Sequence, residues 1–563
     1  MLLALNEPPS PTALNQAVAH GGWALLLMML GVTCIGIRPN GLRRTVTAPV
    51  VYAGLVLIAA TLLASLRGWL PPPLALSGAG TLAATMLVVG SGAIVRLPAH
   101  HWQAAFCAFL LAGAASVAIG LIQVFAPHWA DGDWIARSGI AGRAVGNMRQ
   151  PNHLATLLLW SVVALVPLIE SRRAATRRLW PWMAGTLFSL LLFGVILSGS
   201  RTGLVGLLIL VGWGLFDRRL SRLSQGLLIA SPLICAVSWW LLDLLAAAQG
   251  SGAPLGAAAR VSEGDPSGGR FAIWRDTLML IRQNPLPGVG FGEFNFAWSL
   301  TPFPHRHHAF FDHTHNLLLQ LAVELGIPLA LVILGLLGWG LWQAFDRTRR
   351  VGSFEGASLR AAFVMVLLMA LHSQLEYPLW YAYFLLPTAF AWGLCLGAGQ
   401  GHDPPAAAAR RSPWVLAAGI ALLLGAALMF IDYRRVVVIF APAEDAVPLA
   451  QRITDGRRSW FFAHHADYAL VTTPDEPVTE PGAFGRATHY LLDTRLMIAW
   501  ARSLDAKGER DRARHLAARL REFNNPASVP FFAPCGDPSV VDKPFQCELP
   551  AKAYSWRDFR PAR

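Results

Sequence analysis

The chain has 563 residues, of which 54% are hydrophobic and only 14% are charged. Soluble proteins carry about 25% charged residues, so the composition excludes a purely soluble enzyme. The apolar residues come in repeated runs of roughly 20, the length of a membrane-crossing helix, with charged clusters between them. The composition therefore indicates a polytopic membrane protein.

The formal net charge of +13 would suggest a nucleic-acid partner if the chain were soluble. Here the basic residues lie mainly in short clusters between the apolar runs, where they act as topology signals. We therefore expect membrane lipids around the chain and no nucleic-acid partner.

The hydropathy pattern predicts an all-α polytopic membrane fold with about twelve transmembrane helices. The predicted spans cover residues 22–37, 47–66, 73–95, 103–126, 152–170, 179–198, 203–216, 226–247, 316–345, 360–380, 382–398 and 413–431. The first twenty residues have no basic n-region, so we expect the first span to be an anchor and not a cleaved signal peptide.

Arginines occupy every second connection between these spans, which the positive-inside rule assigns to the cytoplasm. They are Arg38, Arg43 and Arg44; Arg96; Arg172, Arg173, Arg177 and Arg178; Arg218, Arg219 and Arg222; Arg347, Arg349 and Arg350; and Arg410 and Arg411. This arrangement predicts that both termini, a large loop at about 248–315 and everything after Asp432 face the opposite side, the periplasm of a bacterial inner membrane.

We expect a membrane domain at 1–432 and a small helical periplasmic domain at 433–563. Within the latter, Ala487 to Phe523 reads as two amphipathic helices separated near Lys507-Gly508, which resembles one tetratricopeptide-type hairpin. Cys535 and Cys547 flank a short polar loop, and an oxidising compartment would allow them to form a disulfide.

The segment PHRHHAFFDHTHN (304–316) places five histidines, one Asp and one Arg directly before the ninth predicted span. A metal site, a solvated polar loop, and a general base at the membrane surface are all compatible with it. The spacing matches no well-defined zinc pattern, and a helix start would aim His313 and His315 apart, so we expect no metal.

A polar break, SGSRTG (198–203), separates two apolar runs and holds Arg201. An arginine at this depth is costly, which favours a cavity with an anionic partner over a turn whose arginine snorkels outward.

In the predicted loop, an amphipathic helix is expected from about Arg270 to Arg282, lying at the membrane interface with Arg275 on its polar side. The glycines around it do not indicate nucleotide binding, because no strand precedes them and the Walker lysine is missing.

Two further segments carry polar groups at the same predicted side of the membrane. GRAVGNMRQPNH (142–153) contributes Arg143, Gln150, Asn152 and His153, and HSQLEYPLWY (372–381) contributes Glu376 and Tyr377, and we expect these side chains to bind substrate. Interfacial anchoring by aromatic and histidine side chains is the alternative explanation for both. Several arginines with a histidine and few acidic groups suit a lipid-linked phosphate or pyrophosphate.

These motifs resemble those of the bacterial superfamily of O-antigen ligases and protein O-oligosaccharyltransferases. The elements that carry the resemblance are QPNHLAT (150–156), SGSRTG (198–203), GRFAIW with NPLPGVGFGEF (269–294), DHTHNLLLQLAVELG (312–326) and HSQLEYPLWY (372–381). They occur in the right order over most of residues 20–400, and they look more like the protein O-oligosaccharyltransferase branch, known for pilin glycosylation.

The resemblance implies an enzyme that moves an oligosaccharide from undecaprenyl pyrophosphate to an acceptor hydroxyl at the periplasmic face without a metal or other cofactor. It places the essential histidine at His315, which is followed by Asn316 and then Gly326, and the phosphate-binding arginines at Arg201 and Arg270, with Arg275 as a third. A second glycine often found in the family is Leu329 here. The acceptor would be Ser or Thr of a periplasmic, pilin-like protein, and the alternative acceptor is lipid A–core.

Two rival functions remain at this point. A transporter or lipid flippase also uses many spans and basic cavities, but the sequence has no evident inverted repeat and few acidic residues for ion coupling. An O-antigen polymerase would share the arginine-rich loops, but His315-Asn316 and the C-terminal domain favour transfer to a non-glycan acceptor. The acceptor discriminates between the enzymes: a sugar hydroxyl indicates the polymerase or the ligase, and Ser or Thr indicates the glycosyltransferase of proteins.

Overall fold

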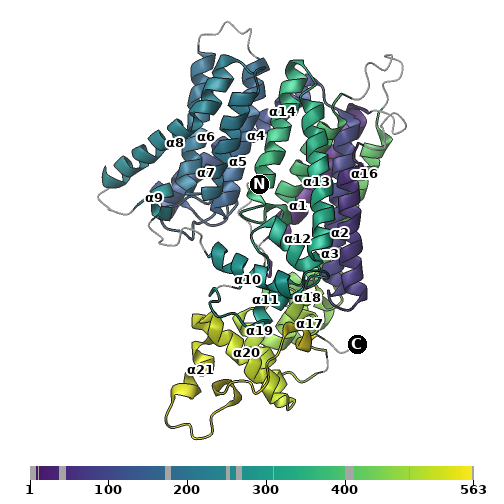
Figure 1. Ribbon diagram of the computed structural model, residues 1–563, viewed down its shortest axis with the longest axis vertical. Helices are drawn as coiled ribbons and strands as arrows, with labels where there is room; N and C mark the ends of the chain where they lie inside the picture. The colour runs from purple at the N-terminus through teal and green to yellow at the C-terminus, as the bar shows by residue number, and fades with distance from the viewer. Residues whose placement is uncertain are drawn as a thin grey trace.

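The computed structural model describes residues 8–10, 12–36, 46–171, 179–248, 254–261, 269–308, 310–399, 411–480 and 482–560. Within these ranges the regular structure is helical, apart from the two-residue strands β1 (Ile35–Gly36) and β2 (Val95–Arg96), which pair antiparallel. A bundle of long helices stands above a layer of shorter helices that includes the C-terminal part of the chain (Figure 1).

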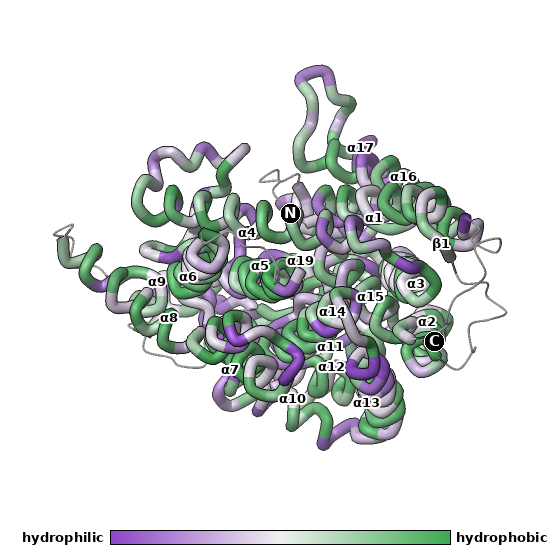
Figure 2. The backbone as a smooth tube through the Cα atoms, turned by 90° about the horizontal axis from the view of Figure 1, so that it is seen from above, coloured by the Kyte–Doolittle hydropathy of each residue, from purple (hydrophilic) through white to green (hydrophobic). Residues whose placement is uncertain are grey.

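Ten of the described helices are long and apolar enough to cross a membrane. They are α1 (Ala13–Thr33), α2 (Ala48–Leu66), α3 (Pro72–Ile94), α4 (Ala99–Phe125), α5 (Pro151–Ser171), α6 (Trp180–Ser198), α8 (Arg222–Ala248), α13 (Ile327–Thr348), α14 (Ser353–His372) and α16 (Pro413–Phe440). Two shorter apolar helices, α7 (Arg201–Phe216) and α15 (Ala382–Gly397), occupy the remaining predicted span positions. The chain is a multi-pass membrane protein, and hydrophobic residues dominate the bundle helices in Figure 2.

The ninth predicted span, 316–345, is wrong as a single helix. The chain forms α12 (Leu317–Leu325), breaks at Gly326 and continues as α13. Gly326 has φ +78°, and a Cβ there would lie 1.9 Å from the carbonyl oxygen of Leu286, so only glycine fits. The break lets α12 leave the bundle and pack on the preceding loop. The boundaries of other spans also differ from the prediction: α1 begins at Ala13 and ends at Thr33, α14 runs from Ser353 to His372, and α16 extends to Phe440.

Helix α5 is the most deeply buried of the candidate spans, with 89% of its apolar window inside the protein. It packs on α4, α6, α7 and α14. Glycines on two neighbours allow the close approach: a Cβ on Gly194 would meet Leu158, and one on Gly206 would meet Leu159. The bundle therefore holds the N-terminal end of α5, with Asn152 and His153, in a fixed place.

The described arginine-rich connections gather at the end of the bundle away from the C-terminal helices. There Arg219 donates to the carbonyl of Val351 and Arg360 pairs with Asp217 at 2.6 Å. The start of α16 is held by the Ser412 N–H bonding the Gly31 carbonyl. The predicted clusters at Arg38, Arg43 and Arg44, at Arg172, Arg173, Arg177 and Arg178, and at Arg410 lie outside the described residues.

The segment after α16 folds into α17 (Leu449–Gly456), α18 (Ala463–Thr472), α19 (Thr494–Ala506), α20 (Arg510–Phe523) and α21 (Val529–Gly536). Helices α19 and α20 form the predicted hairpin, with its turn at Gly508 in the left-handed region, φ +81°. Cys535 and Cys547 are joined by a disulfide.

The C-terminal helices share one hydrophobic core with the loop between α8 and α12, so residue 432 does not separate two independent cores. This cluster joins Ile273, Phe296 and Trp298 to Leu496, Leu516 and Phe523. Within the loop lie α10 (Arg270–Gln283) and α11 (Phe294–Leu300), which Figure 1 shows between the bundle and the C-terminal helices.

The histidine-rich segment is pinned to the end of α20. Buried Arg306 pairs with Glu522 at 3.1 Å and lies over the rings of Trp298, Phe303 and Phe523. Phe310 stacks on Phe523 with ring centroids 3.9 Å apart. The C-terminal helices therefore shape the segment that leads to α12.

We predict that removal of residues 441–563 leaves the bundle inserted but frees residues 301–312, because the apolar rings under Arg306 and Phe310 lose their cover. Limited proteolysis of the full and truncated chains in the same detergent is expected to cut this segment much faster in the truncated chain. Equal cleavage rates would show that the segment holds its conformation without the C-terminal helices.

Candidate functional site

A polar cavity of about 320 Å³ lies at the bundle end that faces the C-terminal helices. Its lining residues are Ile140, Arg143, Arg149, Gln150, Pro151, Asn152, Gly199, Arg201, Arg270, His315 and Glu376. Seven of the side chains predicted from the sequence thus come together from positions more than 200 residues apart: Arg143, Gln150, Asn152, Arg201, Arg270, His315 and Glu376.

Four helices begin at this cavity. Helices α5, α7 and α10 start at Pro151, Arg201 and Arg270, and α12 starts two residues after His315. A helix N-terminus presents free N–H groups and the positive end of the helix dipole. These N-termini and the four lining arginines together give the cavity a positive potential.

Positive charge is crowded in this cavity. Burial and the neighbouring charge of Arg201 both lower the pKa of Arg143. The Arg143 guanidinium donates to the carbonyls of Ser198 and Gly199 at 3.1 and 3.2 Å, which holds the turn between α6 and α7. Arg143 thus supports the position of Arg201 as well as lining the cavity.

Glu376 is the one carboxylate among the described residues that line the cavity. Its Oε1 accepts from Arg270 and from the Asn152 amide, the latter at 2.8 Å. Its Oε2 lies 3.5 Å from His315 Nε2. The carboxylate thereby links α10, α5 and the start of α12 in one polar contact set.

Asn152 extends this set to the start of α7. Ser200 donates its hydroxyl to Asn152 Oδ1 at 2.6 Å, and the same hydroxyl oxygen caps α7 by accepting the Gly203 N–H. Gln150 caps α5 in the same way, because its Oε1 accepts the His153 N–H at 2.7 Å. These amides and hydroxyls fix the cavity walls.

His315 is held in a strained backbone conformation, φ +57°, which a non-glycine residue adopts only when its surroundings impose it. The residues on either side are tied down. The Trp274 indole donates to the Thr314 carbonyl at 3.0 Å, and the Leu317 N–H donates to the Ser373 carbonyl at 2.8 Å. The imidazole therefore has a defined direction, toward Glu376.

The surroundings of His315 strongly disfavour its charged form. Burial, the neighbouring His313 and the charge of Arg270 lower the pKa of His315 to about 2. Burial also raises the pKa of Glu376, against the opposing effect of Arg270. A neutral imidazole thus lies beside a carboxyl group that is paired with Arg270.

Four other predicted residues lie outside this cavity. Asn316 is the N-cap of α12: its Oδ1 accepts the Leu319 N–H at 3.0 Å, and its amide donates to the Gln374 carbonyl. Arg275 faces away, with its guanidinium bonded to the His305 carbonyl at 2.6 Å and its side chain 48% exposed. His153 and Tyr377 line a different cavity.

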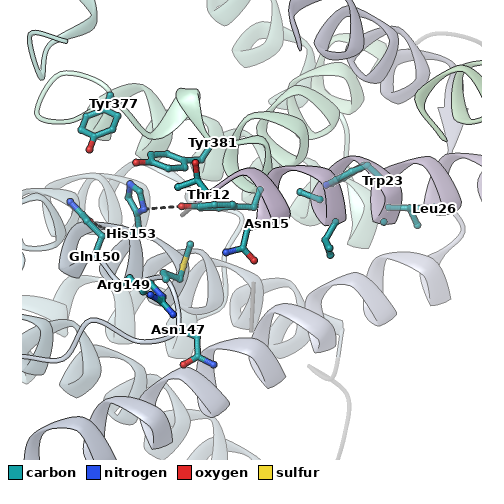
Figure 3. Close-up of a pocket in the computed structure, with 15 residues that line it drawn as sticks. Thr12, Asn15, Trp23, Leu26, Asn147, Arg149, Gln150, His153, Tyr377 and Tyr381 are labelled. Atoms are coloured by element: carbon teal, nitrogen blue, oxygen red, sulfur yellow. Dashed lines mark hydrogen bonds between the residues drawn. The ribbon is translucent and has the colours of Figure 1, made fainter. Parts of the chain in front are cut away.

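This second cavity, of about 610 Å³, shares Arg149 and Gln150 with the first. Figure 3 shows Gln150, His153 and Tyr381 grouped at one end and Trp23 and Leu26 further along α1. The His153 Nδ1 and the Tyr383 hydroxyl are 3.1 Å apart. One end of the cavity is thus polar and aromatic, and the end along α1 is apolar.

Of the five histidines in the segment before α12, only His315 lines the polar cavity. The His313 ring packs on Tyr377 and pairs with Asp312, and His308 Nδ1 lies 3.0 Å from the Phe523 carbonyl. Among the described residues, no three His, Cys, Asp or Glu side chains are grouped as metal ligands.

Sequence reasoning missed two parts of the site. Arg149 lines both cavities and has φ +58°, and the only signal for it was its place in the basic segment 142–153. The second is a buried chain behind His315: Gln320 accepts the Thr314 N–H at 2.8 Å and donates to Glu324 at 2.9 Å. The sequence signal for this buried chain was the i, i+4 spacing of Gln320 and Glu324 on α12.

Burial raises the pKa of Glu324 from its ordinary 4.5 to about 8. The folded protein therefore keeps a proton on Glu324 between about pH 4.5 and 8 that the unfolded chain releases, so stability falls as the pH rises through this window.

We predict that Glu324→Gln removes this fall, because the amide stays neutral while still accepting from Gln320. Thermal melting in detergent at pH 5 to 9 is the measurement. The midpoint of the parent chain should drop more steeply with pH than that of the variant, and parallel curves would contradict the assignment.

Comparison with known proteins gives three family matches in this chain. Residues 186–334 match a family described as O-antigen ligase, residues 360–527 match the C-terminal part of a virulence factor membrane-bound polymerase, and residues 144–168 match a protein glycosylation ligase family. The matched ranges contain every residue that lines the polar cavity except Ile140 and Arg143.

Two curated relatives come from Acinetobacter baylyi. The chain is 29% identical to a general O-oligosaccharyltransferase over 306 residues, which is 52% of this chain and 50% of the relative. It is 26% identical to a ComP-specific O-oligosaccharyltransferase over 264 residues, 46% of this chain and 44% of the relative. The chain thus matches about half the length of these relatives.

Proposed function

We propose that this chain, a member of the O-antigen ligase and protein O-oligosaccharyltransferase superfamily, transfers an oligosaccharide from undecaprenyl pyrophosphate to Ser or Thr hydroxyls of proteins. The observation that carries the proposal is the cavity in which four arginines and four helix N-termini surround one buried histidine and one carboxylate. That inventory suits a diphosphate leaving group next to a proton acceptor.

The diphosphate would lie between Arg201 and Arg270, at the starts of α7 and α10. Guanidinium groups bind phosphate oxygens bidentately, and the helix N-termini add N–H donors and positive potential. Both effects grow as the sugar–phosphate bond breaks and negative charge collects on the leaving group. Catalysis on this account is mainly electrostatic.

The reaction step uses His315 as a general base. The acceptor hydroxyl gives its proton to His315 Nε2 while its oxygen bonds to the anomeric carbon. The bond from that carbon to the diphosphate oxygen breaks, and its electron pair leaves with the undecaprenyl diphosphate. Attack opposite the leaving group inverts the anomeric configuration. No step requires a metal or other cofactor.

The topology supports a periplasmic site in the inner membrane. The described basic connections, including Arg96, Arg219 and Arg349, lie at the bundle end opposite the cavity, and the positive-inside rule assigns that end to the cytoplasm. The C-terminal helices and their Cys535–Cys547 disulfide then lie in the periplasm, which is oxidising.

We propose a protein acceptor because two curated relatives are O-oligosaccharyltransferases, one of them ComP-specific, and the motif resemblance implies an acceptor of the pilin type. The second candidate function is ligation of the glycan to lipid A–core, which the O-antigen ligase match over 186–334 favours. Both use the same cavity and differ only in which hydroxyl reaches His315.

The experiment that tests the function offers purified protein a glycan on undecaprenyl pyrophosphate with a pilin-like protein and lipid A–core as parallel acceptors, with and without EDTA. We expect glycan on the protein, unaffected by EDTA. His315→Ala is expected to lower transfer by at least roughly 10²-fold while the protein still folds and binds donor. Transfer only to lipid A–core would establish the second candidate, and undiminished transfer by the variant would refute the role of His315.

We also predict that Arg201→Lys is impaired by roughly 10- to 100-fold in kcat, because a point charge cannot replace a bidentate fork on the diphosphate. Arg219→Lys, at the opposite end of the bundle, is the matched control. The measurement is the steady-state rate at saturating donor. Equal rates for both variants would show that Arg201 serves only the structure.

A further inference from the structure

We infer that Glu376 exchanges partners during the reaction: it holds Arg270 while the site is empty, and when the donor diphosphate takes Arg270, the freed carboxylate turns to His315 and stabilises its protonated form. The inference rests on the proposed function and goes beyond it, since it makes Glu376 a positioning residue that couples donor binding to the strength of the base. It replaces our sequence-based prediction that Glu376 binds substrate directly.

The first observation behind this inference is that the two carboxylate oxygens of Glu376 have different neighbours. Oε1 is occupied by Arg270 and by the Asn152 amide, whereas Oε2 lies 3.5 Å from His315 Nε2, slightly beyond hydrogen-bond distance. A small rotation of the carboxylate about the bond to Asn152 would bring Oε2 to the imidazole. Asn152 would keep its contact and serve as the pivot.

The second observation is competition for one guanidinium. Arg270 is 16% exposed and opens into the cavity, so a diphosphate entering there meets an arginine already paired with Glu376. A diphosphate carries more negative charge than a carboxylate and offers more acceptor oxygens, so it displaces Glu376 from Arg270. Leaving a buried carboxylate without an ionic partner is costly. His315 Nε2, which lies 3.5 Å from Glu376 Oε2, can then donate a hydrogen bond to that oxygen once it carries a proton.

The third observation is that His315 needs such help. Burial, the neighbouring His313 and the charge of Arg270 lower the pKa of His315 to about 2, which makes the imidazole a poor proton acceptor. A diphosphate bound to Arg270 offsets the Arg270 charge, and the approaching carboxylate adds a negative charge beside the imidazole, so both raise this pKa. Binding of the donor therefore strengthens the base.

The charged and titratable groups that face the pair come from every surrounding element. They are Arg143 and Arg149 before α5, Arg201 on α7, Arg270 on α10, Asp312 and His313 before α12, and Tyr377 and Tyr381 after α14. Within the part of the chain that the structure describes, Arg270 and His315 are the ion-pair contacts of Glu376. The exchange therefore depends on one competing cation.

The test is the variant Glu376→Gln in the full-length protein, with undecaprenyl diphosphate as the binding probe and kcat measured at saturating glycan donor. We expect Kd to fall, by roughly 3- to 10-fold, because Arg270 no longer has to leave a carboxylate. We expect kcat to fall by roughly 10²-fold, because the imidazolium loses its stabilising charge. The acid limb of the kcat–pH profile should move to lower pH.

Two controls make the outcome decisive. Arg270→Gln is expected to weaken probe binding, opposite in direction to Glu376→Gln. Glu170→Gln removes a carboxylate bonded to Ser221 and Ser224 at the far end of the bundle, and reports on general destabilisation alone. Glu376→Asp keeps the charge and should recover part of kcat.

Weaker probe binding in Glu376→Gln would overturn the inference, because it would make Glu376 a structural support or a donor ligand. An unchanged kcat would overturn it as well. Failure of the proposed function is separate, since in that case His315→Ala would keep its transfer activity whatever Glu376→Gln does.

Discussion

The site depends on concentrating positive charge at one end of an apolar bundle, where one carboxylate is paired with it. Arg143, Arg149, Arg201 and Arg270 line one cavity, and four helices point their N-termini at it. Such an assembly is electrostatically unfavourable when empty. Glu376 provides the compensating charge among the described lining residues, and its contact with Arg270 also links α10 to the bundle.

The remaining architecture positions this charge. The buried helix α5 places Asn152 under Glu376, and Gly326 breaks the chain after α12 so that this short helix can pack on the loop at 284–290. The strained backbone at His315 is held by the capping of Asn316 and by Trp274. Together these contacts hold the His315 imidazole close to the Glu376 carboxylate.

The C-terminal helices also help to position His315. Arg306 and Phe310 connect the segment before His315 to Glu522 and Phe523 of α20, and Phe311 in turn packs edge-on against the His315 ring at 5.2 Å. The C-terminal helices thus support the loop segment that leads to His315.

The sequence by itself determined the membrane class and the positions of most spans, because hydropathy is a local property that a run of twenty residues carries alone. It also selected His315, Arg201, Arg270 and Glu376 as site candidates, since each is a polar group in or beside an apolar run, and these four line one cavity. The α19–α20 hairpin was equally visible from its amphipathic period.

Only the tertiary structure decided which of these residues meet. The sequence offered Arg275 and Asn316 as site candidates next to Arg270 and His315, yet Arg275 faces outward and Asn316 caps α12. Each step of one residue along a helix rotates the side chain by about 100°, and no sequence signal fixes which direction faces a distant part of the chain. The break at Gly326 was hidden for the same reason, since the steric demand comes from Leu286, forty residues earlier along the chain. Convergence of residues 143 to 376 on one cavity is a property of packing, which local pattern does not contain.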